Sequence, residues 1–327
     1  MVTLRVAAGI LFSGTLVLGA GMAYGQATST SSGQAYPYKP IRIITSLPGG
    51  ATDFVARLVA AGISGPLGQQ VIVDSRPSSV TADLTMNAQP DGYTLLVEAG
   101  SMWFATLLQK TTYDVLRDFI PITPVIASPL ILVVHPGVAA NSVKDLIALA
   151  KAKPGTVNYG SAGYASAPHL STEMFKYMTG INVVHIPYKG AGPAVVDLVS
   201  GQIQMMIATA VSVMPNIKAG KLKALAITSP QPSALAPGVP TLSATGIPGY
   251  EYVSLNGVFG VAKTPDPIIR RLHQEIVRAL QQPETKERLF NAGTEVYTLS
   301  PEEFTAKLKS EFAKWGKLIK EVGIKAD

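Results

Sequence analysis

Ser161 and His169 are the residues whose types would suit nucleophilic catalysis, but their spacing does not favour it. Ser161 lies in a Gly-Ser-Ala-Gly run, which lacks the glycine-x-serine-x-glycine order of a nucleophile elbow. His169 lies within a predicted helix, and we expect it two turns along that helix rather than beside the hydroxyl. We therefore predict no catalytic residue, and an exported serine hydrolase that uses Ser161 is the alternative.

Metal and nucleotide chemistry find equally little support. The sequence has no cysteine, and its four histidines lie far apart with no partner at metal-ligand spacing: His135, His169, His185 and His273. Gly190 and Gly192 do not form the glycine pattern of a dinucleotide-binding loop. Asp53 and Arg57 have the i, i+4 spacing of a surface ion pair on a helix. We predict no metal and no cofactor.

Two loops of small residues are better suited to binding an anion through backbone N–H groups. The run 48–50, Pro-Gly-Gly, follows a predicted strand, and Thr52 or Asp53 stands at the N-cap position of the next helix. The run 160–166, Gly-Ser-Ala-Gly-Tyr-Ala-Ser, leads into a second helix in the same way. Unpaired N–H groups and the positive end of the helix dipole meet at such a turn. Two facing lobes, each with one such loop, would hold one anion between them.

The elements that position the first loop alternate between strand and helix. Strands are predicted at 41–44, 70–74 and 93–97, with a helix after residue 52 and another around 82–88. This β-α-β-α-β order predicts a parallel sheet with right-handed crossovers. Ser101 follows the third strand at its carboxyl end, where open α/β sheets bind ligands. A buried strand within 122–136 leads toward a second domain.

The second half of the chain repeats this alternation and then returns to the first domain. Helices are predicted at 142–152, 168–179 and 193–200, and strands at 157–159, 183–186, 205–208 and 223–228. Residues 255–261 return the chain, and three helices close it. The last helix has a capping box of Ser300 and Glu303. The length exceeds what one core usually supports, so we predict lobe 1 at 36–136 and 255–327, and lobe 2 at 137–254.

The first residues have the pattern of a secretory signal. Arg5 is the only charge in the first 25 residues, and 6–18 is an apolar run that is short for a membrane span. We predict a signal peptide at 1–25, cleaved near Gly25, a disordered leader at 26–35, and a periplasmic location. The net charge of +6 is scattered and forms no basic stripe, so we expect no nucleic-acid partner.

Several motifs, taken in order, are similar to one protein family: YPYKPIRIITSLPGGATDFVAR, PDGYTLL, YGSAG, HIPYKGAGPAVVDLVSGQ and IKAGKLKALAIT. From Tyr36 to the C-terminus, the chain resembles the Bug-type periplasmic solute-binding proteins of tripartite tricarboxylate transporters. The resemblance implies an α/β, two-lobed Venus-flytrap fold, with mixed sheets flanked by helices and two chain crossings at the hinge. It also implies capture of a small di-, tri- or aromatic carboxylate for membrane permease subunits, with a two-component sensor as a second partner. We expect a monomer.

In this family, backbone amides, hydroxyls and waters from one loop of each lobe hold the ligand carboxylate. Position assigns that role here to Leu47, Gly49, Gly50, Thr52, Asp53, Ser161, Ala162, Gly163 and Ser166. Asp53 is expected to orient a water or accept a hydrogen bond rather than touch an anion. Trp103, Phe104 and Tyr164 either line the pocket, which would suit an aromatic carboxylate, or pack at the hinge or in the core.

Departures from the family pattern concern the far end of the predicted pocket. Ser78-Ser79-Val80-Thr81 replaces a glycine-rich run, and Thr209 stands where an acidic or amide residue is usual. Ser78, Ser101 and Thr209 complete the predicted ligand contacts. The changed loop means that a tricarboxylate should not be assumed, and a signalling protein with a degenerate cleft is a further alternative.

Overall fold

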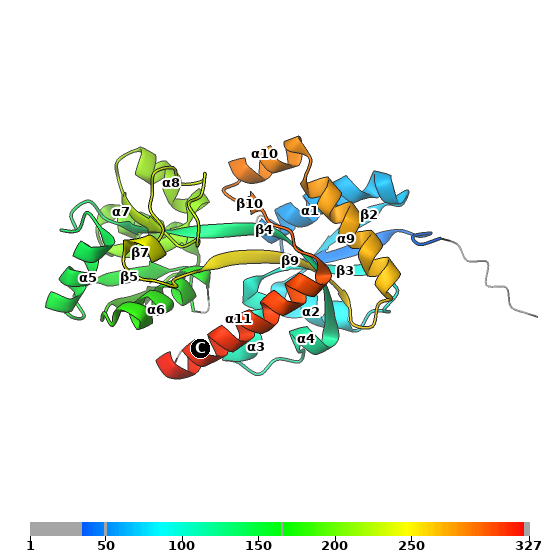
Figure 1. Cartoon of the computed structure of the whole chain (residues 1–327), viewed down its shortest axis with the longest axis horizontal. Helices are drawn as coiled ribbons and strands as arrows, with labels where there is room; N and C mark the ends of the chain where they lie inside the picture. The colour runs from blue at the N-terminus through cyan, green and yellow to red at the C-terminus, as the bar shows by residue number, and fades with distance from the viewer. Residues whose placement is uncertain (1–34, 49–50, 165, 324–327) are drawn as a thin grey trace, which may run out of the picture. The chain divides into compact units, whose positions relative to one another are not determined.

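The computed structural model describes residues 35–48, 51–164 and 166–323, and Figure 1 traces them. The predicted signal peptide and residues 26–34 of the predicted leader lie outside the described residues. Gly49 and Gly50 of the first loop lie outside them as well. Among the helices that are described, none has the length and apolar character needed to cross a bilayer.

The first part of the chain folds as the predicted parallel unit. β1 (Ile41–Thr45) lies between β2 (Val71–Ser75) and β3 (Thr94–Ala99), and both strands pair with it in parallel. The helices that follow these strands are α1 (Ala51–Leu67), α2 (Ser78–Met86) and α3 (Gly100–Leu108). Each helix starts near the carboxyl end of a strand, so three helix N-termini gather along one edge of the sheet.

α1 begins earlier than the sequence suggested. Thr52 and Asp53 lie inside its first turn, so the prediction that one of them is the N-cap is wrong. Both side chains bond to neighbouring elements instead, which the local sequence does not reveal. The spacing of Phe54, Val55, Leu58, Val59 and Ile63, which predicts one apolar helix face, was the better guide: Phe54 is half-buried and the other four are buried.

β4 (Phe119–Val134) connects the two lobes without a break. A short helix, α4 (Val115–Asp118), leads into it. Up to Pro129, β4 pairs with β9 (Val253–Val261), and from Leu130 it pairs with β7 (Met205–Thr209) and β8 (Lys223–Ile227). β4 and β9 therefore run side by side toward lobe 2 (Figure 1). The lobe boundaries placed at residues 136 and 255 stay a prediction.

β4 starts at Phe119, three residues before the range 122–136 within which we predicted a buried strand. Its register against β9 shifts between Pro121 and Thr123 and again between Pro124 and Ile126. Proline cannot donate to a strand ladder, and bulges are where sheets accept it. The two bulges therefore allow the strand to include Pro121 and Pro124.

Lobe 2 has its own parallel strands. β5 (Asn158–Ser161) pairs in parallel with β6 (Val184–Pro187) and with β7. Its helices are α5 (Val143–Ala152), α6 (Ala167–Thr179), α7 (Ala191–Ser200) and α8 (Ala210–Lys218). α5 has the predicted N-cap, Ser142, whose hydroxyl accepts the N–H of Asp145 at 3.1 Å. We did not predict α8, which contains Pro215.

The chain returns through β9, which is antiparallel to both β3 and β4. The full sheet order is β2-β1-β3-β9-β4-β7-β5-β6. The remaining elements are the 3₁₀ turn η1 (Ser243–Thr245), α9 (Asp266–Leu280), α10 (Pro283–Asn291), β10 (Glu295–Val296) and α11 (Pro301–Val322). The capping box of Ser300 and Glu303 at the start of α11 is confirmed.

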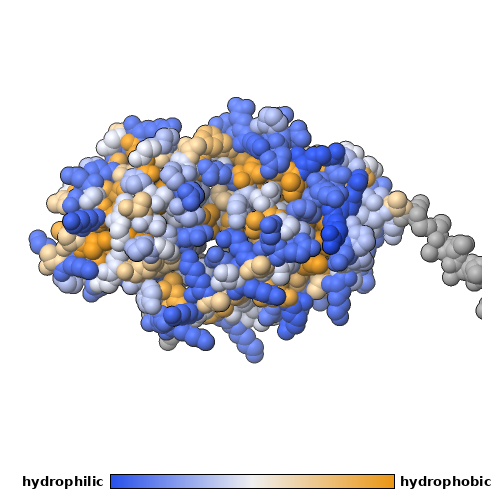
Figure 2. Space-filling view, in the orientation of Figure 1, coloured by the Kyte–Doolittle hydropathy of each residue, from blue (hydrophilic) through white to orange (hydrophobic). Residues whose placement is uncertain are grey.

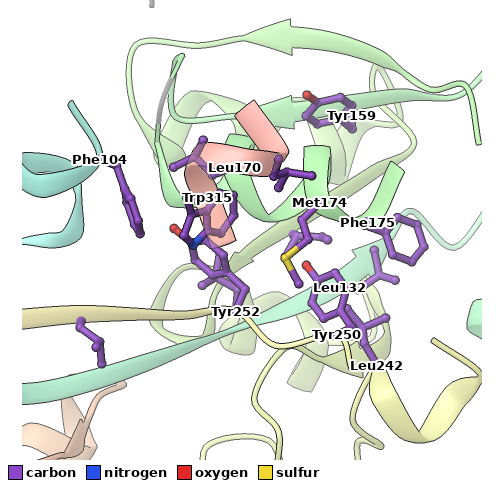
Figure 3. Packing of buried hydrophobic residues seen from close by; sticks show 14 of the residues in the cluster. Phe104, Leu132, Tyr159, Leu170, Met174, Phe175, Leu242, Tyr250, Tyr252 and Trp315 are labelled. Atoms are coloured by element: carbon purple, nitrogen blue, oxygen red, sulfur yellow. The ribbon is translucent and has the colours of Figure 1, made fainter. Parts of the chain in front are cut away.

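Trp315 of α11 lies in a core cluster that includes side chains of both lobes. It is 1% exposed, and its ring lies 5.3 Å from that of Phe104 and 5.5 Å from that of Tyr252. The same cluster contains Leu170 and Phe175 of α6, as Figure 3 shows. Apolar surface on the face seen in Figure 2 falls in small patches separated by hydrophilic residues.

Candidate functional site

The carboxyl ends of the parallel strands of the two lobes point toward each other along β4. β3 ends at Ala99, which pairs with Asn256 of β9, and Asn256 in turn pairs with Ile126 of β4. β7 runs the opposite way and ends at Thr209, opposite Leu130 of β4. Four strand residues separate these levels, about 13 Å at 3.3 Å per residue. The strand-to-helix loops of both lobes therefore open onto the same short stretch.

All the predicted contacts that are described lie at such junctions. The β1–α1 junction contributes Leu47, Thr52 and Asp53, and the starts of α2 and α3 contribute Ser78 and Ser101. In lobe 2, the β5–α6 loop contributes Ser161, Ala162, Gly163 and Ser166, and Thr209 ends β7. Ligand contact by these residues, and by Gly49 and Gly50, stays a prediction.

At the β1–α1 junction, polar side chains hold the first turn of the helix in place. Asn256 Nδ2 donates to Thr52 Oγ1 at 3.0 Å, which ties α1 to the end of β3 through β9. Asp53 is buried, and it accepts from Arg57 Nε at 2.9 Å, Arg57 Nη2 at 3.0 Å and Ser75 Oγ at 2.7 Å. The hydrogen bond from Arg57 lowers the pKa of Asp53, so the carboxylate stays ionised.

The interpretation of Asp53 and Arg57 as a surface ion pair needs correction on one side. Arg57 is 54% exposed, but the Asp53 side chain is only 7% exposed. The guanidinium neutralises a carboxylate that would otherwise oppose an anion at this helix N-terminus. Asp53 also lines a cavity of about 470 Å³. Val211 of α8, in lobe 2, lines the same cavity.

A different cavity, of about 420 Å³, lies between α2 and α3, and we call it the α2–α3 cavity. Ser78 and Ser79 at the start of α2 and Ser101 in the first turn of α3 line it, so the structure brings the predicted residues Ser78 and Ser101 together. Its wall also contains Glu98, which lies near the end of β3 and is 3% exposed. Burial raises the pKa of Glu98. The sequence analysis did not single out Glu98.

The lobe 2 loop is held by Ser161. Its hydroxyl accepts the N–H of Gly163 at 3.1 Å and lies 3.0 Å from the Gly163 carbonyl oxygen and 2.6 Å from His185 Nε2. Gly163 has a φ of +118°, a conformation open essentially to glycine alone. Ser166 caps α6, and its Oγ donates to the Gly163 carbonyl at 2.6 Å. The side chains of Ser161 and Ser166 therefore fix the backbone of the loop at Gly163.

The expectation that the histidines lie far apart is wrong for two of them, and His169 lies in the first turn of α6 and not two turns along the helix. The rings of His169 and His185 stack with centroids 4.3 Å apart, and His185 also stacks on Tyr159 at 4.8 Å. The cause is topological: β5 and β6 are parallel neighbours, and Tyr159 pairs with His185. A strand–helix–strand pattern predicts that its two strands are parallel neighbours. The pairing of β5 with β6 was therefore the sequence signal that we missed.

The contact between Ser161 and His185 does not make a hydrolase site. Ser161 has no exposed surface, so its oxygen is not open to a substrate. The Gly163 N–H, which would be an oxyanion donor, is already bonded to that oxygen. Beneath the stack, Tyr159 donates to Glu173 at 2.5 Å, and Glu173 pairs with Lys176 at 2.7 Å. The arrangement is that of a fixed support for the loop.

The three aromatic residues left open by the sequence separate into two groups. Trp103 and Phe104 are buried, and their rings lie in the cluster that contains Phe259 and Trp315. Tyr164 is 47% exposed and lies edge-on to His169 and His185. Tyr164 is therefore the aromatic side chain exposed at the lobe 2 loop. Within the described ranges, no three His, Cys, Asp or Glu side chains gather as metal ligands would.

The two lobes also approach each other where α8 meets the segment after α10. A Cβ on Gly293, whose φ is +72°, would lie 2.8 Å from Cβ of Val211. Nearby, Ser233 Oγ donates to Glu295 Oε1 at 2.7 Å. Thr209 Oγ1, at the start of α8, lies 3.0 Å from Ser212 Oγ. Thr209, a predicted ligand contact at the end of β7, therefore lies close to the place where α8 meets the segment after α10.

Known proteins identify the family of this arrangement. A family model described as "Tripartite tricarboxylate transporter family receptor" matches residues 55–324. The chain belongs to this family. BugT of Bordetella pertussis is 35% identical over 301 residues, which cover 90% of this chain and 92% of BugT. The resemblance seen in the sequence is thereby confirmed.

Solved structures of similar proteins confirm the two-lobed α/β fold of this family. A protein of R. palustris, solved with adipate, matches with a TM-score of 0.75 at 30% identity, covering 89% of this chain and 99% of that one. MatC from Rhodopseudomonas palustris, solved with bound malate, matches with a TM-score of 0.71 at 27% identity, covering 87% and 100%. The chain is thus a receptor for a solute, in a family of periplasmic binding proteins.

Proposed function

We propose that this receptor binds a small organic carboxylate between the two lobes and delivers it to the membrane permease subunits of a tripartite transporter. The observation that supports this most is the meeting of two sets of strand carboxyl ends within about 13 Å along β4. Open α/β sheets bind ligands at such ends, and helix N-termini there favour anions. The similar proteins solved with adipate and with malate make a carboxylate the natural ligand class.

The binding mechanism follows from the two loops. Backbone N–H groups of the β1–α1 turn and of the lobe 2 loop, with Ala162 in place of Gly163 because the Gly163 N–H is bonded to Ser161, hold the carboxylate, and hydroxyls and waters complete its shell. The ligand bridges the lobes and shifts the population toward the closed form. The Ser161, Ser166 and His185 side chains act by fixing the lobe 2 loop. Removal of a signal near Gly25 and a monomeric state complete the proposal.

A melting-temperature screen against aliphatic and aromatic mono-, di- and tricarboxylates tests this function. A true ligand at 100 times its Kd adds about 2.7 kcal/mol of apparent stability. We expect such a shift, and no turnover of model esters by the same protein. Ester hydrolysis that disappears in Ser161→Ala would support the hydrolase instead. A protein that melts at the same temperature with every carboxylate would have a degenerate cleft.

Two glycine variants localise the site. Gly163→Ala forces an alanine to a φ of +118°, a strain of about 1–3 kcal/mol, and we expect Kd for any ligand found to rise by about 10- to 100-fold as the loop moves. Gly180→Ala is the matched control, because Gly180 has a φ of +66° at the end of α6 and its Cβ would meet nothing. It should cost about 1 kcal/mol of stability and leave Kd unchanged. Equal effects of both variants on Kd would place the site elsewhere.

A further inference from the structure

Glu98 is the charged side chain buried in the wall of the α2–α3 cavity. It is 3% exposed, whereas Asp83 in the same wall is half-buried and bonded to Thr112 Oγ1 at 2.6 Å, and Lys110 is exposed. Water screens exposed charges far more than buried ones. The potential that a ligand meets inside this cavity is therefore set mainly by Glu98.

The Glu98 carboxylate has acceptor capacity left for a ligand. Oε1 accepts from Thr81 Oγ1 at 2.9 Å, and Oε2 accepts from the N–H of Ala99 at 3.3 Å. A carboxylate has about four lone-pair sites, so these two bonds use about half of them. None of the ion pairs formed within the described part of the chain includes Glu98. This differs from Asp53, which has the guanidinium of Arg57.

Tyr113 lines the same cavity. Burial, and then the nearby carboxyls of Glu98 and Asp83, raise the pKa of Tyr113 to about 12. Its hydroxyl donates to the carbonyl of Met102 at 2.9 Å, so it is committed as a donor to the protein. Among the described residues of the cavity wall, Ser78, Ser79 and Ser101 have hydroxyls that can accept from or donate to a ligand.

The cavity lies at the same edge of the sheet as the β1–α1 turn. Glu98 pairs with Gly257 of β9, and the preceding residue of β9, Asn256, donates to Thr52 in the first turn of α1. Neighbouring strand residues face opposite sides of a sheet, so the Glu98 side chain lies on the α2–α3 side and the Asn256–Thr52 bond on the α1 side. A ligand whose carboxylate is bound at that turn meets Glu98 by reaching across the carboxyl ends of the strands.

We propose that Glu98 selects a ligand with a cationic end: a small carboxylate that also has an ammonium group, which enters the α2–α3 cavity. This inference rests on the proposed function and narrows its substrate class. The ammonium donates to the open acceptor sites of Glu98, and the serine hydroxyls take its remaining protons. A dicarboxylate of equal length brings a second anion against a buried anion, which disfavours it.

Matched ligands of one chain length test this selection. 6-Aminohexanoate, 6-hydroxyhexanoate and adipate each have a carboxylate at one end and differ in the group at the other end: ammonium, hydroxyl or carboxylate. 4-Aminobutanoate and succinate are a shorter pair that differ in the same way. We measure Kd for each by calorimetry on the full protein. The wild type should prefer the amino compound over the diacid by about 10-fold or more, the usual scale of a charge-assisted hydrogen bond. This comparison needs no variant, so a folding defect cannot obscure it.

Glu98→Gln should change the two affinities in opposite directions. The amino compound should weaken by about 10-fold or more, and the diacid should bind several-fold more tightly, because the opposing charge is gone. Glu275→Gln is the matched control, since Glu275 is also buried but lies on α9 with Arg271 and Arg278. It should change neither Kd, and Lys110→Gln should change neither by more than about 3-fold, because Lys110 is exposed.

Three results would overturn the inference. One is tighter binding of diacids than amino compounds by the wild type; another is the same direction of change for both ligands in folded Glu98→Gln. The third is a large loss of diacid binding in Lys110→Gln, which would mean that Lys110 contacts the far end of the ligand. In each case a carboxylate still binds, so the proposed function stands. If no carboxylate of any kind binds the wild type, both proposals fall.

Discussion

In both lobes a strand leads through a short loop into a helix at the candidate site, and we call each of these junctions a corner. The two corners differ in the charged side chains that lie near them. In lobe 2, the loop from Ser161 to Gly163 rests on hydroxyls and on the stacked rings of His169 and His185. In lobe 1, two buried carboxylates stand near the helix N-termini. Asp53 is paired with Arg57 and its pKa is lowered, whereas Glu98 forms no ion pair with the described residues and burial raises its pKa.

This difference suggests a division of labour. On the two proposals above, the uncharged loop from Ser161 to Gly163 provides affinity for the carboxylate end that all the ligands share. On the same proposals, lobe 1 provides selectivity, because Asp53 is neutralised by Arg57 whereas Glu98 takes part in none of the ion pairs among the described residues.

The largest expected effect comes from the core that both corners share. Trp315→Ala removes a fully buried ring from the cluster formed by α3, α6 and α11, and should lower the free energy of unfolding by about 3–5 kcal/mol in urea titrations. The order of ligand affinities should not change. Phe290→Ala, at a 44% exposed site, should change stability by no more than about 0.5 kcal/mol. A reordered ligand preference in Trp315→Ala would mean that the core sets selectivity.

A smaller effect tests the neutralised carboxylate of lobe 1. Arg57→Met leaves Asp53 buried without its guanidinium and should cost about 1–2 kcal/mol at pH 7, since water can partly replace a side chain that is half exposed. The folded pKa of Asp53 lies below its unfolded value, so the ion pair stabilises the protein above about pH 4 and its contribution is lost as the pH falls through the folded pKa. The difference between variant and wild type should therefore shrink toward pH 3.

Arg270→Met is the control for this experiment. Arg270 pairs with Glu302 at 3.7 Å, and both side chains are about two-thirds exposed or more, at 67% and 70%. Its loss should change stability by less than about 0.5 kcal/mol at either pH. If Arg57→Met behaved like Arg270→Met, Asp53 would not depend on its partner, and the contrast with Glu98 would disappear.

The smallest effect concerns the unpaired carboxylate. The folded pKa of Glu98 lies above its unfolded value, so its ionisation costs stability as the pH rises from about 4. Glu98→Gln removes that cost but loses the bond from the Ala99 N–H to Oε2. The melting temperature of the variant relative to wild type should therefore rise between pH 4 and pH 7 in ligand-free protein. A difference that is constant with pH would show that Glu98 does not titrate differently on folding.

The elements of this fold were largely readable from the sequence because their signals are local. The apolar spacing of α1, the Ser142 cap of α5 and the capping box of α11 each depend on residues within a few positions. Where partners from distant segments decide the outcome, prediction failed. Thr52 and Asp53 are not caps because Asn256, Ser75 and Arg57 bind their side chains. Pro121 and Pro124 of β4 lie at bulges that are defined only by pairing with β9.

The same distinction between local sequence signals and contacts with distant segments applies to the candidate site. The loops could be placed because glycines, serines and strand ends are visible in sequence. The meeting of His169 with His185 could not be inferred without the register of β5 and β6. Glu98 was missed because a single acidic residue at the end of an apolar strand gives no sign of its burial or of the cavity beside it.

β4 belongs to both sheets, and this limits how the receptor can move. Its ladder passes from β9 to β7 and β8 between Pro129 and Leu130 without leaving strand conformation. Leu130 is also tied to Thr228, with its N–H on the Thr228 hydroxyl at 2.8 Å. Opening of the two lobes must therefore bend or twist the hydrogen-bonded strands β4 and β9 rather than a flexible loop. Paired strands resist stretching more than twisting, so we expect the angle between the lobes to change over a narrow range, without local unfolding of β4.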